Sequence, residues 1–149
     1  MKILIACSSG GHLAQAMALR PWWEQHERLW VTGPTADARM KLRGERVVAC
    51  HYPTTRNLPN LWRNMFLARK VLREWQPDVV FSTGAAIAVP FILQARRFGA
   101  RSIFLETIDR LEGPSISGRL VYPFVDEYLG QWDDLVEALP RAQHVGVVL

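Results

Sequence analysis

Lys2-Ile3-Leu4-Ile5-Ala6-Cys7, followed by Ser8-Ser9-Gly10-Gly11-His12, is the stretch of sequence that decides the fold. Residues 2–7 are a short and almost uniformly apolar run, which is typical of a strand buried on both faces of a sheet. The serine- and glycine-rich turn after it leads into a helical pattern that continues to Pro21. A buried strand that passes through a glycine turn into a helix is the opening unit of a Rossmann-like α/β fold.

The same alternation of short apolar runs and helical patterns continues along the chain, which predicts a parallel sheet with helices on both faces. Seven strands are expected, at residues 2–7, 28–31, 46–51, 78–82, 101–106, 127–131 and 144–148. Helices are expected at 11–20, 35–42, 60–75 and 86–97, and residues 111–122 predict a turn or a short helix. Thr35 is expected to cap the second helix, Pro90 to lie in the first turn of the fourth, and Gly99 to end it.

The composition fits one globular domain over residues 1–149. Of these residues 49% are hydrophobic and 21% charged, which is ordinary for a globular protein. A chain of 149 residues is long enough for one hydrophobic core and too short for two. Cys7 and Cys50 fall in apolar runs or at their ends and are expected to be buried thiols rather than a disulfide. The formal net charge of +4 favours anionic partners, without choosing among nucleic acid, acidic lipid and phosphorylated substrates.

Any membrane contact is expected to be peripheral, since no apolar run reaches about 18 residues. In the helix at 60–75, the residues expected to pack on the sheet are Leu61, Met65, Ala68, Leu72 and Trp75. A second stripe on its flank consists of Trp62, Phe66, Arg69 and Arg73. This stripe is either an ordinary amphipathic flank whose arginine stems cover the rings, or a surface for a membrane or a partner. Trp22 and Trp23 raise the same question, because two adjacent tryptophans are hard to bury together.

Ligands of a parallel sheet bind beyond the carboxyl ends of its strands, and the first such loop is residues 8–12. Its glycines let the backbone approach a ligand, and the following helix presents free N–H groups to an anion. We expect Ser9, Gly10 and Gly11 to bind substrate and His12 to hydrogen-bond it or act as a general base. The alternative is a tight turn without a ligand. A nicotinamide dehydrogenase is not expected, because the G-x-G-x-x-G fingerprint and an acid after the second strand are missing.

Two further loops offer polar or small residues at the same edge. The loop after the third strand carries Arg56 and Asn57, which suit a phosphate or sugar hydroxyls, although a plain solvated loop is an equal alternative. The loop after the fourth strand carries Thr83 and Gly84 in a second small-residue turn that can approach a ligand by its backbone.

The fourth loop begins with a carboxylate at the end of an apolar strand. Burying such a group is unfavourable unless it is paired or functional. Glu106 is therefore either paired with Arg110 or His12, or it acts as a ligand for sugar hydroxyls or as a base, with Thr107 beside it.

The ordered motifs resemble a known family over essentially the whole chain. They are Ser9-Gly10-Gly11-His12, Ser82-Thr83-Gly84, Ile103-Phe104-Leu105-Glu106-Thr107, Gly118-Arg119-Leu120-Val121-Tyr122-Pro123 and Gly130-Gln131-Trp132. This series resembles the membrane-recruiting, acceptor-side subunit of the bipartite UDP-N-acetylglucosamine transferase of dolichol-linked oligosaccharide synthesis, and more closely its bacterial counterparts in capsular and exopolysaccharide synthesis. It is also similar to the amino-terminal domain of the peptidoglycan lipid-intermediate transferase.

The resemblance implies one half of a GT-B glycosyltransferase, active only with a separate catalytic subunit that holds the UDP-sugar. This half would bind a polyprenyl-diphosphate-linked sugar acceptor. The resemblance implies that residues 10–12 face the acceptor diphosphate and the cleft between the two halves of the enzyme. It also implies that residues 82–84 line this cleft. Glu106 and Arg110 would form the polar pair beside it. His12 is our first choice for the general base and Glu106 the second.

The resemblance implies no cofactor and no metal, and the dispersed arginines do not favour nucleic acid. Eukaryotic members carry an amino-terminal membrane helix, whereas this sequence begins at its first strand. We therefore expect a cytoplasmic protein, peripheral on the inner face of the cell membrane, held there by the stripe and the tryptophan pair.

One alternative to a glycosyltransferase subunit that takes part in catalysis is a non-catalytic scaffold that recruits and stabilises the catalytic subunit. Another is a stand-alone nucleotide-binding protein. The strand at 144–148 belongs either to the subunit junction or simply to the sheet.

Overall fold

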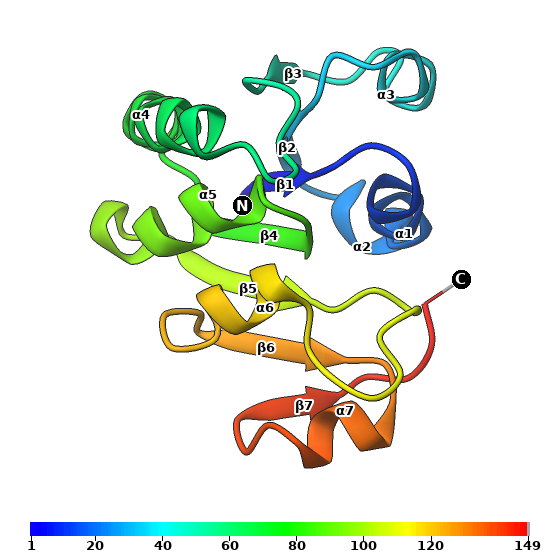
Figure 1. The fold of residues 1–149 in the computed structure, drawn as a ribbon. Helices are drawn as coiled ribbons and strands as arrows, with labels where there is room; N and C mark the ends of the chain where they lie inside the picture. Colours follow the sequence, from blue (N-terminus) through cyan, green and yellow to red (C-terminus); the bar gives the residue numbers. More distant parts are fainter. Residues whose placement is uncertain (149) are drawn as a thin grey trace.

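The computed structural model of the protein describes residues 1–148. Its strands form one parallel sheet in the order β3-β2-β1-β4-β5-β6-β7 (Figure 1). The strands are β1 Lys2–Cys7, β2 Glu27–Thr32, β3 Val47–Ala49, β4 Val79–Gly84, β5 Arg101–Leu105, β6 Glu127–Gly130 and β7 Ala142–His144. The predicted parallel sheet is confirmed, and the bounds of β1 are those predicted.

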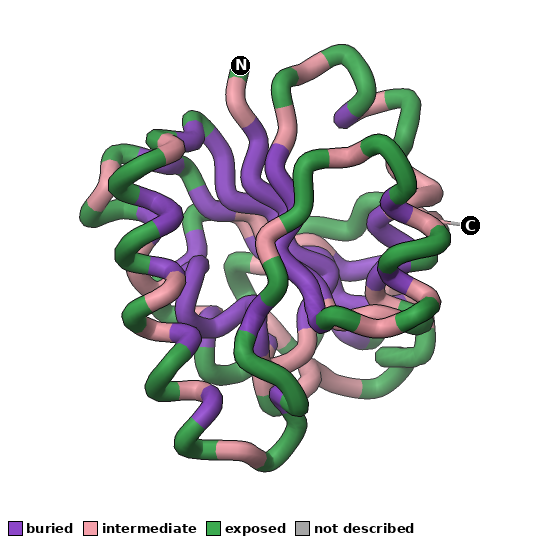
Figure 2. The backbone as a smooth tube through the Cα atoms, turned by 90° about the horizontal axis from the view of Figure 1, so that it is seen from above, coloured by how far each residue is buried: buried purple, intermediate pink, exposed green. Residues whose placement is uncertain are grey.

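Helices cover both faces of the sheet (Figure 1). They are α1 Gly11–Ala18, α2 Arg20–Trp23, α3 Ala36–Lys41, α4 Leu58–Trp75, α5 Ala88–Ala95, the 3-10 helix η1 Arg96–Phe98, α6 Ile116–Val121 and α7 Asp133–Glu137. One buried cluster lies between the sheet and α4, α5 and α6, and a second lies between the sheet and α1, α2 and α3. Figure 2 shows the buried segments running along the central strands, with exposed segments around them. No helix within residues 1–148 has the length and apolar character needed to span a bilayer.

The strand order reverses between β1 and β4, which are neighbours although β2, β3 and the four helices α1 to α4 separate them in sequence. Cys7, the last residue of β1, is paired with Gly84, the last residue of β4. At such a switch point the connections leave in opposite directions, so a crevice opens at the carboxyl edge of the sheet. The loops that follow β1 and β4 therefore meet at this crevice.

Two element predictions are wrong, and each has a local cause. The first helix ends at Ala18, and Pro21 lies in the first turn of a new helix, α2, where its missing N–H is not needed. The last strand covers Ala142–His144 rather than residues 144–148, because Gly146 has a φ of 78° and interrupts an extended path. As predicted, Thr35 caps the start of α3, and Gly99 ends the helical segment that α5 and η1 form.

Trp22 and Trp23 do not form an exposed surface for a membrane or a partner, contrary to the prediction. Trp23 is buried, its indole N–H donates to the carbonyl of Ala16, and its ring packs edge-on against Trp30. Trp22 is half-buried and its ring packs edge-on against Phe81. Both rings find apolar neighbours because adjacent positions on α2 point about 100° apart.

Both cysteines are free and buried, as predicted. Burial raises the pKa of the Cys7 thiol to about 12 and that of Cys50 to about 11. Neither thiol is therefore ionised near neutral pH, and both act as small apolar groups of the core.

Candidate functional site

His12 and Thr83 form two hydrogen bonds with each other across the switch point. The Nδ1 atom of His12 lies 2.8 Å from the carbonyl oxygen of Thr83, and the Thr83 hydroxyl donates to the carbonyl of His12 at 2.7 Å. The imidazole also lies over Gly84, where an added Cβ would come within 3.2 Å of the ring. The absence of a side chain at Gly84 thus leaves the space that the imidazole occupies.

This contact determines the proton position on His12. A carbonyl oxygen only accepts hydrogen bonds, so Nδ1 of a neutral imidazole facing it carries the proton. The other nitrogen, Nε2, is then an acceptor, and no hydrogen bond within residues 1–148 engages it. An imidazole oriented in this way is able to take a proton from a substrate hydroxyl.

The amino terminus of α1 lies in the same crevice. No hydrogen bond of the described residues engages the backbone N–H groups of Gly11, His12 and Leu13, and no atom lies within 4 Å of a Cβ built on Gly11. Free N–H groups at the positive end of a helix favour an anion.

Gly10 departs from its predicted substrate-binding role. Its N–H donates to a carboxylate oxygen of Asp37 on α3 at 2.8 Å. The pKa of Asp37 is lowered, first by the hydrogen bond from Lys41 and then by this N–H. The loop thus already binds one anionic group of the protein itself, which leaves Gly11 to Leu13 for an external anion.

A hollow of about 450 Å³ opens beside His12, lined also by Gln15, Thr107 and Asp109. The Thr107 hydroxyl donates to Asp109, and this bond is the first cause of the lowered pKa of Asp109, with the nearby charges of Arg110 and His12 adding to it. The carboxylate of Asp109 therefore lies at the same hollow as the imidazole of His12. Asp109 was not singled out from the sequence, although it lies in the loop that Glu106 begins.

The predicted pairing of Glu106 with Arg110 or His12 is wrong. Glu106 is 1% exposed, and its Oε1 accepts hydrogen bonds from the Ser115 backbone N–H at 2.8 Å, the Ser115 hydroxyl at 3.0 Å and the Tyr128 hydroxyl. Burial and the neighbouring carboxylate raise the pKa of Tyr128. Glu106 therefore ties the loop before α6 to β6, and its burial removes it from contact with a substrate in this structure.

Three other predicted binding residues are not among those that line the hollow beside His12. Arg110 is exposed and lies 3.8 Å from a carboxylate oxygen of Asp109. Asn57 caps α4 by accepting from the N–H of Asn60 at 2.9 Å. Arg56 is exposed in the loop before α4, and no contact among residues 1–148 links it to the hollow.

Gln15 and Gln131 join three loops behind the hollow. The Gln131 amide donates to Gln15 Oε1 at 2.8 Å and to the Glu106 carbonyl at 2.9 Å, and its oxygen accepts from the Val148 N–H at 2.8 Å. Residues 145–148 consequently run back towards α1 (Figure 1). Two buried amides give no periodic pattern, so this network could not be found from sequence.

The stripe on α4 is exposed. Trp62 and Phe66 are 67% and 68% exposed, their ring centroids lie 6.1 Å apart, and Arg69 and Arg73 are exposed beside them. The alternative in which arginine stems cover these rings is therefore wrong. Of the residues predicted to pack on the sheet, Ala68 and Leu72 are buried, whereas Leu61, Met65 and Trp75 are half-buried.

Comparison with known proteins shows which family the chain belongs to. The UDP-N-acetylglucosamine transferase subunit ALG14 of Eremothecium gossypii is 36% identical over 89 residues, which is 55% of this chain and 39% of that protein. The UDP-N-acetylglucosamine--N-acetylmuramyl-(pentapeptide) pyrophosphoryl-undecaprenol N-acetylglucosamine transferase of Rippkaea orientalis is 32% identical over 158 aligned positions, which cover 98% of this chain and 44% of that protein. This chain thus spans about two-fifths of the length of these two relatives.

The fold has a close counterpart among solved structures. The crystal structure of Acinetobacter baumannii MurG superposes with a TM-score of 0.74 at 17% identity, covering 91% of this chain and 43% of that one. This agrees with the expected architecture of one half of a GT-B protein. A family model described as "Oligosaccharide biosynthesis protein Alg14 like" matches residues 43–148, well over half of the sequence. The chain therefore belongs to the Alg14-like family of oligosaccharide biosynthesis proteins.

Proposed function

We propose that this chain is the acceptor-binding subunit of a two-component, inverting glycosyltransferase of polysaccharide biosynthesis. Its substrate is a polyprenyl-diphosphate-linked sugar, and a separate donor-binding subunit supplies the UDP-sugar. The observation that carries this proposal is the orientation of His12, whose Nδ1 is bonded to Thr83 while Nε2 is free at a hollow. A scaffold that only recruited its partner would not need this arrangement.

The reaction assigns one task to each part of the site. The acceptor diphosphate lies on the free N–H groups of Gly11 to Leu13. The acceptor hydroxyl attacks the anomeric carbon of the donor sugar, a new C–O bond forms, and the bond from that carbon to UDP breaks. The proton of the hydroxyl moves to Nε2 of His12. The Asp109 carboxylate stabilises the resulting imidazolium.

The test is reconstitution of the complete pair. This chain is purified with the product of a neighbouring glycosyltransferase gene and mixed with UDP-sugars and lipid-linked acceptors. We expect transfer only when both chains are present, and tight binding of the acceptor, but not the UDP-sugar, at the His12 hollow of this chain. Transfer by the partner alone at the rate of the pair would contradict the proposal.

We also propose that the α4 stripe binds the inner face of the cell membrane. Two exposed aromatic rings beside Arg69 and Arg73 combine apolar area with positive charge, which is the pattern of a helix lying in an anionic lipid surface. The apolar residues Leu58 and Pro59 extend this surface at the start of the helix.

Changing Trp62 and Phe66 together to serine is expected to reduce binding to anionic liposomes at least tenfold, because burying each ring contributes about 1.5–3 kcal/mol. Flotation measures this, and raising the salt concentration should weaken the wild-type binding. The control is Met40→Ser, since Met40 is 74% exposed on α3, at the other face of the sheet. Equal flotation of the double variant and the wild type would rule out the stripe.

A further inference from the structure

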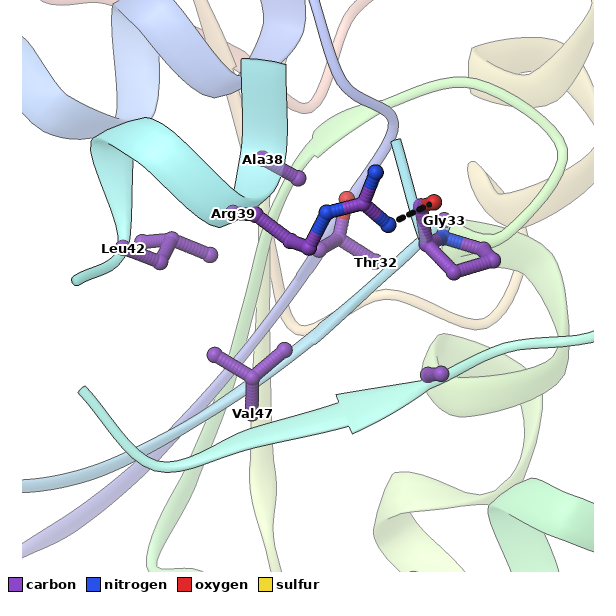
Figure 3. Close-up of a pocket in the computed structure, with 8 residues that line it drawn as sticks. Thr32, Gly33, Ala38, Arg39, Leu42 and Val47 are labelled. Atoms are coloured by element: carbon purple, nitrogen blue, oxygen red, sulfur yellow. Dashed lines mark hydrogen bonds between the residues drawn. The ribbon is translucent and has the colours of Figure 1, made fainter. Parts of the chain in front are cut away.

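A second pocket lies apart from the His12 hollow, between α3 and the ends of β2 and β3. It has a volume of about 490 Å³. Its walls are mainly apolar and include Gly33, Ala38, Leu42 and Val47 (Figure 3). A volume of this size is within the range of small-molecule sites. The proposed transfer reaction does not use this pocket.

Thr32 places an unsatisfied polar atom at the wall of this pocket. The residue is 1% exposed and lines the pocket wall, and its Oγ1 is the one buried side-chain polar atom of residues 1–148 without a hydrogen-bond partner. A buried hydroxyl without a partner destabilises the folded protein, and such groups are rare in native structures. A ligand that offers a donor or an acceptor at this depth would satisfy it.

Arg39 supplies a cation at the same wall. Its guanidinium, labelled in Figure 3, donates a hydrogen bond to the carbonyl of Pro34 at 2.8 Å. Within residues 1–148 no carboxylate pairs with Arg39 or with Arg43, which follows one turn later, whereas Lys41 between them pairs with Asp37. Arg43 is not one of the residues that line this pocket; together with Arg39 it lines a neighbouring hollow on α3. The mouth of the pocket is thus positive and open to an anionic group.

We infer that this pocket binds a nucleoside monophosphate-like ligand. The flat ring lies between the apolar walls, a ring nitrogen or carbonyl hydrogen-bonds to Thr32 Oγ1, and the phosphate lies on Arg39, with Arg43 adding positive charge from the neighbouring hollow. An isoprenyl phosphate fits the charge and the apolar walls equally well. It has no atom that would satisfy the Thr32 hydroxyl, which is why the heterocyclic ring is favoured.

The experiment measures binding of uridine 5′-monophosphate and adenosine 5′-monophosphate to the full chain by calorimetry, with geranyl phosphate and inorganic phosphate as comparison probes. Thr32→Val removes only the hydroxyl and is expected to weaken nucleotide binding roughly three- to tenfold. Arg39→Gln is expected to weaken it roughly tenfold or more. Arg97→Gln is the matched control, because Arg97 is an exposed arginine of η1 outside the pocket, and it should bind as the wild type does.

A second measurement separates a binding role from a structural one. Because the Thr32 hydroxyl has no partner, Thr32→Val is expected to raise the melting temperature of the ligand-free chain by roughly 2–4 °C. Weaker nucleotide binding together with a higher melting temperature supports the site.

Three outcomes would overturn it. They are binding of neither nucleotide at millimolar concentration, nucleotide binding that is indifferent to both variants, and binding of geranyl phosphate alone. The last would assign the pocket to a lipid chain. Because this experiment uses the chain without its partner and measures no sugar transfer, its failure leaves the proposed function untouched.

Discussion

Sugar transfer by the reconstituted pair is expected to fall about 10²–10⁴-fold when His12 is replaced by alanine, the loss typical of removing a general base. The fall should appear in kcat rather than in KM for the acceptor. This follows because the proton moves in the transition state, whereas the diphosphate is held by backbone N–H groups that the substitution leaves in place.

His12→Asn separates the base from its structural role. The asparagine amide can donate to the Thr83 carbonyl as Nδ1 does now, but it provides no basic nitrogen at the position of Nε2. We therefore expect a folded and inactive variant. His51→Ala is the control, because the side chain of His51 is exposed and its hydrogen bonds to Asn64 are made by its backbone. Full transfer by both His12 variants would favour the scaffold hypothesis.

Gly118→Ala is expected to destabilise the fold by about 3 kcal/mol, which lowers the melting temperature by roughly 10 °C. A Cβ on Gly118 would overlap both Glu106 Oε1 and the Tyr128 hydroxyl, and both groups are buried. Relief requires that the carboxylate or the phenol move out of its hydrogen bond, which leaves a buried polar group without a partner. Thermal and urea unfolding measure the change.

Two companion variants test this cause. Gly113→Ala in the preceding loop should change stability by less than about 0.5 kcal/mol, because a Cβ there has no close neighbour within 4 Å among residues 1–148. Tyr128→Phe removes the hydroxyl that the Cβ meets, so combined with Gly118→Ala it should cost less than the sum of the two single changes. Strict additivity, or a Gly118→Ala protein as stable as the wild type, would contradict the packing described around Glu106.

The sequence predicted the elements well where local patterns are strong. Buried parallel strands give apolar runs, so β1 and the sheet class could be predicted directly. The long amphipathic repeat predicted α4 and the stripe on its flank, although it left open whether the rings of the stripe are covered. The sequence-based prediction failed at the first helix and at the last strand. Pro21 is compatible with either the end of one helix or the first turn of the next, and Gly146 accepts either an extended or a positive-φ backbone; packing selects between these alternatives.

The sequence alone determined the fold class, the glycine turn after β1 and the presence of His12 at its end, because these depend on neighbouring residues. Tertiary structure decided what the polar groups do. His12 meets Thr83, 71 positions away, because the strand order brings β1 and β4 together. Glu106 was expected to reach a cation, and it accepts instead from Ser115 and Tyr128. A hydrogen bond requires two atoms within about 3 Å, and such proximity between distant residues exists only once the sheet has formed.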